Sequence, residues 1–232
     1  MAHISDKLQA VTAEIVAAAR NAGRDPSEIA LLAVSKTVSP DIVLEAYQAG
    51  QRAFGENYLQ EALDKIAALK DRTPGLEWHF IGPIQSNKTR PIAENFSWVH
   101  SVDRLKIAQR LSEQRPAGLP PLNICLQVNV SGEASKSGCT PQDVPELAQA
   151  VAALPRLALR GLMTIPEPAS TEAAQRQPLR ALRLLAEQLR DQGHALDTLS
   201  MGMSADLAAA IAEGATMVRI GTAIFGERHY AK

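Results

Sequence analysis

The sequence predicts an α/β protein: a single (β/α)8 barrel of the TIM type with an extra N-terminal helix. Short apolar segments of strand type alternate with helical patterns along the 232 residues, and such alternation is typical of a parallel sheet. There are eight of these units, the number that closes into a barrel. An open doubly wound sheet is the alternative. No long linker or low-complexity segment divides the chain, so we expect residues 1–232 to form one domain.

An amphipathic helix opens the chain, because its apolar residues recur on one helical face: Ile4, Leu8, Val11, Ile15 and Ala18. The first predicted strand is 29–35. Ser39 and Pro40 then have the pattern of a helix start, and Gly50 ends that helix. The next three strands with their helices are 53–56 with 58–69, 77–80 with 86–95, and 98–102 with 104–114.

Four more strands are expected in the second half: 123–130, 157–162, 199–201 and 217–220. Thr140 and Pro141 mark the start of the first helix there. The second helix follows a loose segment at 166–178, and the third runs from an N-cap at Ser204 to Gly214. Only a short tail follows the last strand.

Composition excludes several classes of protein. The chain has 24 basic and 25 acidic residues and a net charge of −1, which gives no electrostatic reason to bind nucleic acid or an anionic membrane. No stretch approaches the roughly 20 apolar residues of a membrane span. Cys125 and Cys139 form no CxxC pair, and the five histidines lack metal-ligand spacing. We therefore expect a cytoplasmic protein with reduced thiols and no metal.

Lys36 directly follows the first predicted strand, a position at the active face of a barrel. Partial burial beside a strand disfavours an ammonium ion and so leaves the amine free to attack a carbonyl. The resulting imine is the usual attachment of pyridoxal 5′-phosphate (PLP) or of a carbonyl substrate. The alternative is a solvated lysine after a strand.

The loops after the seventh and eighth strands each combine a glycine with a hydroxyl, Gly202 with Ser204 and Gly221 with Thr222. Barrels commonly bind phosphate at these two loops, through backbone N–H groups and a helix N-terminus. Alternatively, Ser204 is only an N-cap and the glycines are turn residues.

Arg219 lies within an apolar strand and must find a partner there. That partner is either a carboxylate or, with functional meaning, the pyridine nitrogen of PLP. A charged guanidinium beside this nitrogen disfavours its protonation and weakens the ring as an electron sink.

Six separated motifs then occur in order along nearly the whole chain. They are LAVSKT at 32–37, FGENY at 54–58, WHFIG at 78–82 with QSNK at 85–88, GLMT at 161–164, LSMGMS at 199–204 and VRIGT at 218–222. This ordered set closely resembles the pyridoxal phosphate homeostasis proteins, which are related to the barrel domain of alanine racemase.

The resemblance implies a monomeric PLP barrel of fold type III, with PLP held as an internal aldimine on Lys36. It implies these further cofactor-binding residues: Asn57, Ser204, Arg219, Gly221 and Thr222. We also predict His79 and Met203 at the cofactor. The resemblance also implies a protein that buffers PLP and supplies it, with apo PLP-dependent enzymes as recipients, and that affects vitamin B6 and amino-acid balance without catalysis of its own.

Two side chains keep alternative interpretations. His79 either flanks the cofactor ring or is a satisfied histidine of the inner barrel layer. Lys136, on a loop after the fifth strand, is either solvated or accepts PLP during its transfer.

A PLP-dependent racemase of low activity is the alternative function. A racemase needs a base on each face of the substrate α-carbon, and Lys36 can serve only one. In alanine racemase a tyrosine of a separate β-domain serves the other, whereas this sequence ends after the last barrel strand. Tyr47, Tyr58 and Tyr230 are its only tyrosines, and none matches that role. A lysine Schiff-base aldolase is a third class, which the ordered motifs disfavour.

Overall fold

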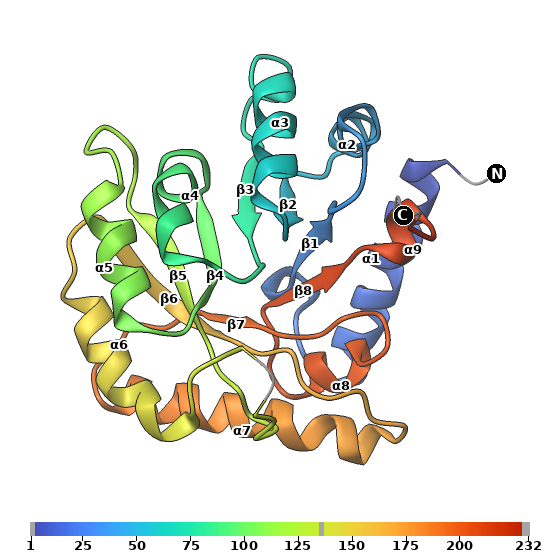
Figure 1. The fold of residues 1–232 in the computed structure, drawn as a ribbon. Helices are drawn as coiled ribbons and strands as arrows, with labels where there is room; N and C mark the ends of the chain where they lie inside the picture. Colours follow the sequence, from blue (N-terminus) through green and yellow to red (C-terminus); the bar gives the residue numbers. More distant parts are fainter. Residues whose placement is uncertain (1–2, 135–136, 229–232) are drawn as a thin grey trace.

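The computed structural model describes residues 3–134 and 137–228 and contains a closed barrel of eight parallel strands (Figure 1). Each strand pairs with the next along the chain, and β1 pairs with β8 to close the sheet. The strands are β1 (Ala30–Val34), β2 (Ala53–Glu56), β3 (Glu77–Phe80), β4 (Trp98–Val102), β5 (Leu122–Gln127), β6 (Leu157–Met163), β7 (Thr198–Ser200) and β8 (Met217–Ile220). The predicted barrel is confirmed, and the alternative of an open sheet is wrong.

Helices surround the barrel. The α-helices are α1 (Ile4–Asn21), α2 (Pro40–Gln48), α3 (Leu59–Leu69), α4 (Thr89–Asn95), α5 (Leu105–Gln114), α6 (Val144–Ala152), α7 (Glu172–Asp191), α8 (Leu207–Ala212) and α9 (Thr222–Phe225). Three 3₁₀ turns, η1 (Pro26–Glu28), η2 (Ser86–Lys88) and η3 (Pro141–Asp143), lead into β1, α4 and α6. At α2 the predicted cap is confirmed, since Ser39 Oγ accepts from the Ile42 N–H at 3.4 Å and Pro40 is the first helical residue.

The extra helix α1 completes the outer layer. It packs against α8, α9 and α2 (Figure 1). Because α9 is a single turn, α1 covers the side of the barrel that a full helix after β8 would cover. Its buried stripe includes Ile4, Leu8, Val11 and Ile15, as the sequence pattern predicts, but ends with Ala19 in place of the predicted Ala18.

Alternation along the strands divides the core into an outer and an inner part. Val218 and Ile220 of β8 belong to the large cluster between barrel and helices. Met217, by contrast, packs with Leu32, Val34 and Ile81 inside the barrel. Arg219, two residues after Met217, therefore points into the interior as well.

The predicted loose segment at 166–178 is wrong in its second part. Helix α7 begins at Glu172, where Thr171 Oγ1 accepts from the Ala174 N–H at 3.2 Å, and it runs through Pro178. A proline inside a helix removes one backbone hydrogen bond. The helix continues past it because its next turns bury an apolar face: Leu179, Leu182, Leu185, Ala186 and Leu189.

The predicted N-cap at Ser204 is also wrong. Helix α8 begins at Leu207 with Asp206 at its N-cap position, and Asp206 Oδ1 accepts from the Met203 N–H at 2.7 Å. Ser204 thus lies in the turn between β7 and α8. The fifth strand ends at Gln127 rather than at residue 130, and the expected tail after β8 contains the one-turn helix α9.

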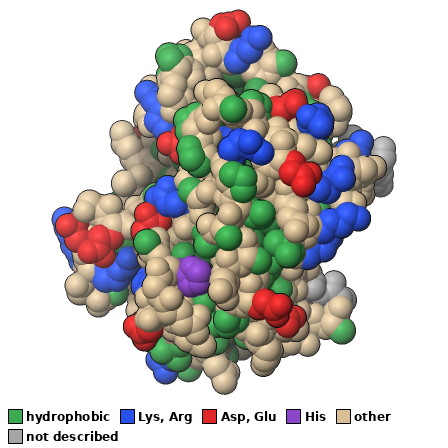
Figure 2. All heavy atoms as spheres, turned by 90° about the vertical axis from the view of Figure 1, so that its left-hand side faces the viewer, with side chains coloured by type: hydrophobic (Ala, Val, Ile, Leu, Met, Phe, Trp, Pro, Cys, Tyr) green, Lys and Arg blue, Asp and Glu red, His purple; other side chains and the backbone are tan. Residues whose placement is uncertain are grey.

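The surface carries mixed charge. Figure 2 shows Lys and Arg side chains interspersed with Asp and Glu over one face of the molecule, in keeping with the balanced composition. Over residues 3–134 and 137–228, no helix is both long enough and apolar enough to cross a membrane.

Candidate functional site

A cavity of about 400 Å³ lies at the carboxyl ends of the strands, the end at which (β/α)8 barrels carry their sites. It is lined by Val34, Lys36, Asn57, Ile81, Ile165, Met203, Ser204, Ala205, Arg219, Gly221, Thr222 and Arg228. These residues come from the ends of β1, β2, β3, β6, β7 and β8, so that segments far apart in sequence meet around one hollow.

The cavity brings together all but one of the predicted site residues: Lys36, Asn57, Met203, Ser204, Arg219, Gly221 and Thr222. His79 is the exception. It is buried in the barrel interior, where its ring stacks on Trp98 with centroids 5.3 Å apart and planes 5° apart. This is the position of the inner-layer alternative, but His79 Nε2 is buried without a hydrogen-bond partner and so is not satisfied there. Lys136 lies outside the described residues.

The charge of the cavity is one-sided. Lys36, Arg219 and Arg228 line it, and none of its described lining residues is acidic. Ser204 and Thr222 add hydroxyl donors, and Ile81, Ile165 and Met203 add apolar surface. Such a set suits a ligand that has an anionic group and a flat apolar body.

Two glycines shape the side of the cavity formed by the β7 and β8 loops. Gly202 has φ +102°, which favours glycine, and a Cβ there would also lie 2.6 Å from the Ala210 Cβ. A Cβ on Gly221 would collide with Arg228 Nη2 and lie 3.0 Å from the Val34 carbonyl oxygen. Glycine at 221 therefore leaves room for the Arg228 guanidinium beside the start of α9, whose first N–H groups have no intrahelical acceptor.

Arg228 is a site residue that sequence reasoning missed. Its Nε is buried without a hydrogen-bond partner, and its Nη2 donates to the Val34 carbonyl at a long 3.4 Å. A buried, unsatisfied guanidinium N–H on a cavity wall is a donor available to a ligand. The sequence signal is an arginine shortly after Gly221, the glycine that follows the last strand. It was missed because this segment was expected to be only a short tail.

Arg219 finds neutral acceptors. Its Nη1 donates to Ser200 Oγ at 2.8 Å and its Nη2 to the Thr164 carbonyl at 2.9 Å. Among the described residues, no carboxylate forms an ion pair with it, so the expected carboxylate partner is not found there. Burial lowers the pKa of Arg219 to about 10, and the side chain remains a cation at neutral pH.

Behind Arg219 a chain of hydrogen bonds crosses the barrel. Ser200 Oγ lies 2.7 Å from His100 Nδ1, and His100 Nε2 lies 2.9 Å from His79 Nδ1. Ser200 is on β7 and His100 on β4, strands separated by two others, so their side chains meet across the interior. His79 Nε2 then lies 3.6 Å from Glu77 Oε2, longer than a hydrogen bond.

The direction of this chain follows from Arg219, which can only donate. With Arg219 donating to Ser200 Oγ, the hydroxyl proton goes to His100 Nδ1, and His100 Nε2–H donates to His79 Nδ1. The reverse direction would turn the lone pair of His79 Nε2 toward the Glu77 carboxylate and leave the Ser200 proton without a described acceptor.

Both histidines are therefore neutral Nε2–H tautomers. Burial lowers the pKa of His79, and burial followed by the proximity of His79 and Arg219 lowers that of His100 well below 6.5.

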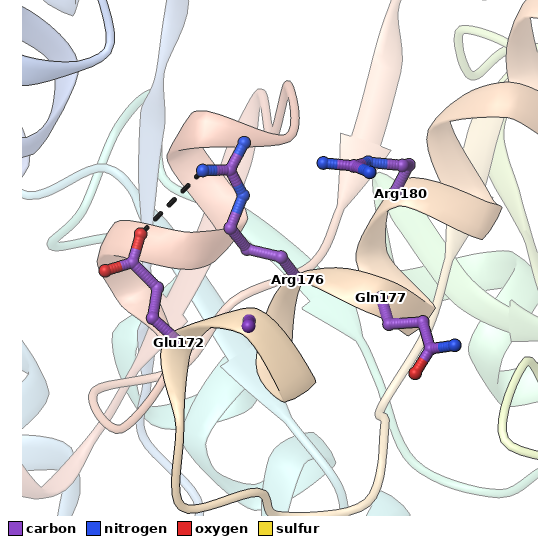
Figure 3. A pocket seen from close by; sticks show the side chains of 5 residues that line it. Glu172, Arg176, Gln177 and Arg180 are labelled. Atoms are coloured by element: carbon purple, nitrogen blue, oxygen red, sulfur yellow. Dashed lines mark ion pairs between the residues drawn. The ribbon is translucent and has the colours of Figure 1, made fainter.

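A second hollow, of about 530 Å³, lies on α7 (Figure 3). Arg176 and Arg180 line it, and Arg176 Nη1 lies 3.9 Å from Glu172 Oε1. Both arginines, with Arg183, also pair with the buried Glu213. Glutamates balance these arginines, so the hollow lacks the one-sided charge of the first cavity. Within the described ranges, no three His, Cys, Asp or Glu side chains gather as a metal site.

Comparisons with known proteins show the family of the chain. The model of the family "alanine racemase, N-terminal domain" matches residues 7–229. The chain is 67% identical to a pyridoxal phosphate homeostasis protein of Pseudomonas aeruginosa, over 99% of this chain and 98% of the relative. It is 55% identical to the protein of the same name in Escherichia coli K12, over 100% of both chains. The solved structure of PipY from Synechococcus elongatus with PLP bound is similar, with a TM-score of 0.84 and 38% identity over 96% of this chain and 100% of PipY.

Proposed function

Since the chain belongs to the alanine racemase N-terminal domain family and, within it, to the pyridoxal phosphate homeostasis proteins, we propose that it binds PLP covalently through Lys36 and holds it for supply to other proteins. One observation carries this proposal: a single cavity that combines Lys36 with the β7 and β8 loops and has no acidic lining among the described residues.

The residues present fit PLP. The group supplies an aldehyde, whose carbon bonds to Lys36 Nζ while its oxygen leaves as water with two amine hydrogens. Ser204, Gly221, Thr222 and Arg228 would hold the phosphate through hydroxyl, backbone and guanidinium donors. The apolar side chains and Asn57 of the cavity would then be available to the ring.

Arg219 is assigned to the pyridine nitrogen of the ring. Its guanidinium stays charged at neutral pH and disfavours protonation of that nitrogen, which makes the ring a weak electron sink. Reactions through a carbanion are then slow, a property that suits a carrier.

The side chains around the cavity also favour storage of PLP over catalysis of racemisation. Racemisation needs a base on each face of the α-carbon. Among the described lining residues, only Lys36 has a side chain that ordinarily acts as a base; the others are apolar, amide, hydroxyl or guanidinium groups. The proposal therefore assigns no catalytic residue.

The proposal extends to the setting of the protein. Residues 1–232 act as one PLP-binding domain and as a monomer, the state that the resemblance to the family implies. The recipients are apo PLP-dependent enzymes. A cytoplasmic location is consistent with Cys125 and Cys139, which are both free thiols.

A spectrum tests the attachment. Protein incubated with PLP is expected to gain a visible absorption band that borohydride removes and that the Lys36→Ala protein lacks. The matched control is Lys88→Ala, which removes an exposed lysine outside the cavity and should keep the band. An unchanged band in Lys36→Ala would contradict the proposal.

A second measurement separates carrier from racemase. The holoprotein, mixed with an apo PLP-dependent enzyme, is expected to restore that enzyme's activity. With pure L-amino acids it should produce no D-isomer at enzyme-like turnover, and substantial D-isomer would favour the racemase instead.

A further inference from the structure

Lys36 lies in a tight turn with an unusual backbone. The Val38 N–H donates to the Ser35 carbonyl at 3.0 Å, so that Lys36 and Thr37 are the central residues of the turn. Thr37 has φ +62°, a region that a β-branched residue rarely adopts. Such a conformation persists only where its surroundings hold it.

A buried ion cluster lies against this turn. Lys65, whose side chain is 3% exposed, donates through Nζ to Glu56 Oε1 at 2.7 Å and to Glu61 Oε1 at 2.5 Å. Glu56 ends β2, and Glu61 and Lys65 lie one turn apart on α3. Strand β2 and helix α3 thus bring three charges to the end of β1.

The cluster holds both peptide groups that flank the Lys36 Cα. Lys65 Nζ donates to the Ser35 carbonyl at 2.6 Å, and Glu61 Oε1 accepts from the Thr37 N–H at 2.6 Å. Ser35 Oγ also donates to Glu56 Oε1 at 2.9 Å. The backbone on either side of Lys36 is therefore fixed by one connected set of charged groups.

A buried ion pair is an inefficient source of stability, because desolvation of the charges offsets their attraction. An apolar pair of similar volume could fill the same space. An apolar pair could not, however, accept a hydrogen bond from the Thr37 N–H or donate one to the Ser35 carbonyl. Glu61 accepts the first of these bonds and Lys65 donates the second.

We propose that Glu61 and Lys65 are positioning residues for Lys36: together they fix the turn 35–38 and so aim the Lys36 amine at the aldehyde of the ligand. The inference rests on the proposed function for the identity of that aldehyde. Neither residue lines the cavity, so their effect passes through the backbone of Lys36.

The test compares two ligands in the full-length protein. PLP can bond to Lys36, whereas pyridoxamine 5′-phosphate has the same ring and phosphate but no aldehyde. Glu61→Ala is expected to weaken PLP attachment about tenfold, the effect of losing one hydrogen bond to a charged group. Pyridoxamine 5′-phosphate should bind with an affinity within about twofold of wild type, since its phosphate and ring contacts remain.

Two further variants sharpen the comparison. Glu61→Gln keeps an oxygen that can accept the Thr37 N–H and should lie closer to wild type than Glu61→Ala. Asp64→Asn removes a charge from an exposed position on the same helix and should bind both ligands as wild type does.

Hydrogen exchange tests the turn without any ligand. The Thr37 amide of the apo protein is expected to exchange about tenfold faster in Glu61→Ala than in wild type. If Glu61→Ala attaches PLP as wild type does, or loses both ligands equally, the positioning role is overturned. If wild type itself attaches no PLP, the proposed function fails, while the exchange of Thr37 still decides whether Glu61 holds the turn.

Discussion

Lys36 and Arg219 are two basic side chains of one cavity, and the protein supports them in different ways. The turn that carries Lys36 is held by full charges, with Lys65 between Glu56 and Glu61. Arg219 is held by a hydroxyl and a backbone carbonyl, with neutral histidines behind the hydroxyl.

Access to water differs between the two places through Glu61 alone, since Glu56 and Lys65 are as buried as Arg219. Glu61 is 32% exposed, so part of the charged cluster remains solvated. Arg219 and His100 are 4% and 0% exposed, and each further charge in such a place costs several kcal/mol in desolvation. The barrel interior therefore holds the Arg219 cation with neutral acceptors, and burial lowers the pKa of Arg219 to about 10 without discharging it at neutral pH.

Removing the central charge of the cluster should have the largest effect on stability. Lys65→Met leaves the buried Glu56 carboxylate and the half-buried Glu61 carboxylate without their cation, and we expect a loss of about 4 kcal/mol in the free energy of unfolding. Urea denaturation at neutral pH measures it.

The matched control is Arg90→Met. Arg90 and Glu94 form an exposed pair, 64% and 44% accessible, at 3.8 Å, and such pairs contribute less than about 1 kcal/mol. Equal losses in the two variants would show that the cluster behaves as a surface pair.

Breaking the neutral chain should cost less. Ser200→Ala leaves Arg219 Nη1 and His100 Nδ1 without their shared partner, and a buried unsatisfied group costs about 2 kcal/mol. The same urea experiment measures this loss. Ser170→Ala, at an exposed serine, should change stability by less than about 0.5 kcal/mol, and a Ser200→Ala protein as stable as this control would contradict the described chain.

The histidines of the chain predict a pH dependence of known sign. Both have a folded-state pKa below the ordinary 6.5, because burial disfavours the imidazolium. Below about pH 6.5 the unfolded chain thus binds more protons, and each histidine lowers stability by up to about 1.4 kcal/mol per pH unit on acidification. Above that pH both histidines are neutral in the folded and in the unfolded chain, so they no longer lower the stability.

Unfolding at about pH 7.5 and pH 5.5 measures this slope. In the His100→Gln protein this slope should be smaller by the contribution of about one proton, up to about 1.4 kcal/mol per pH unit. In addition, long-range ¹H–¹⁵N spectra at neutral pH should show Nε2–H tautomers for His79 and His100. A His100→Gln slope equal to wild type would exclude His100 as a buried neutral group.

The smallest effect is expected at the turn itself. Thr37→Gly removes the strain of a β-branched residue at φ +62°, about 1–2 kcal/mol, but adds the chain entropy of glycine, about 0.5–1 kcal/mol. The net expectation is a gain of about 0.5 kcal/mol in unfolding free energy. A marked loss would show that the Thr37 side chain stabilises the turn.

Local patterns were sufficient for much of the fold. The strands are short apolar runs and most helices carry a cap or an apolar stripe, so the barrel could be predicted from periodicity and order. The exceptions have local causes: Pro178 argued against a helix that tertiary packing sustains, and Ser204 had the composition of an N-cap, a position that Asp206 occupies.

The lining of the candidate cavity was predictable where its residues lie one or two positions after a strand, as Lys36, Asn57 and Gly221 do. Its supports were not. The contact of His100 with Ser200 spans 100 residues and depends on which side chains meet inside the closed barrel. Likewise, Glu61 and Lys65 look like an ordinary helical ion pair until the fold places them against the turn 35–38.

The attachment site can be measured directly. Holoprotein reduced with borohydride, digested with trypsin and analysed by mass spectrometry is expected to carry the pyridoxyl mass on the peptide that contains Lys36. Pyridoxyl mass confined to any other lysine would contradict the account.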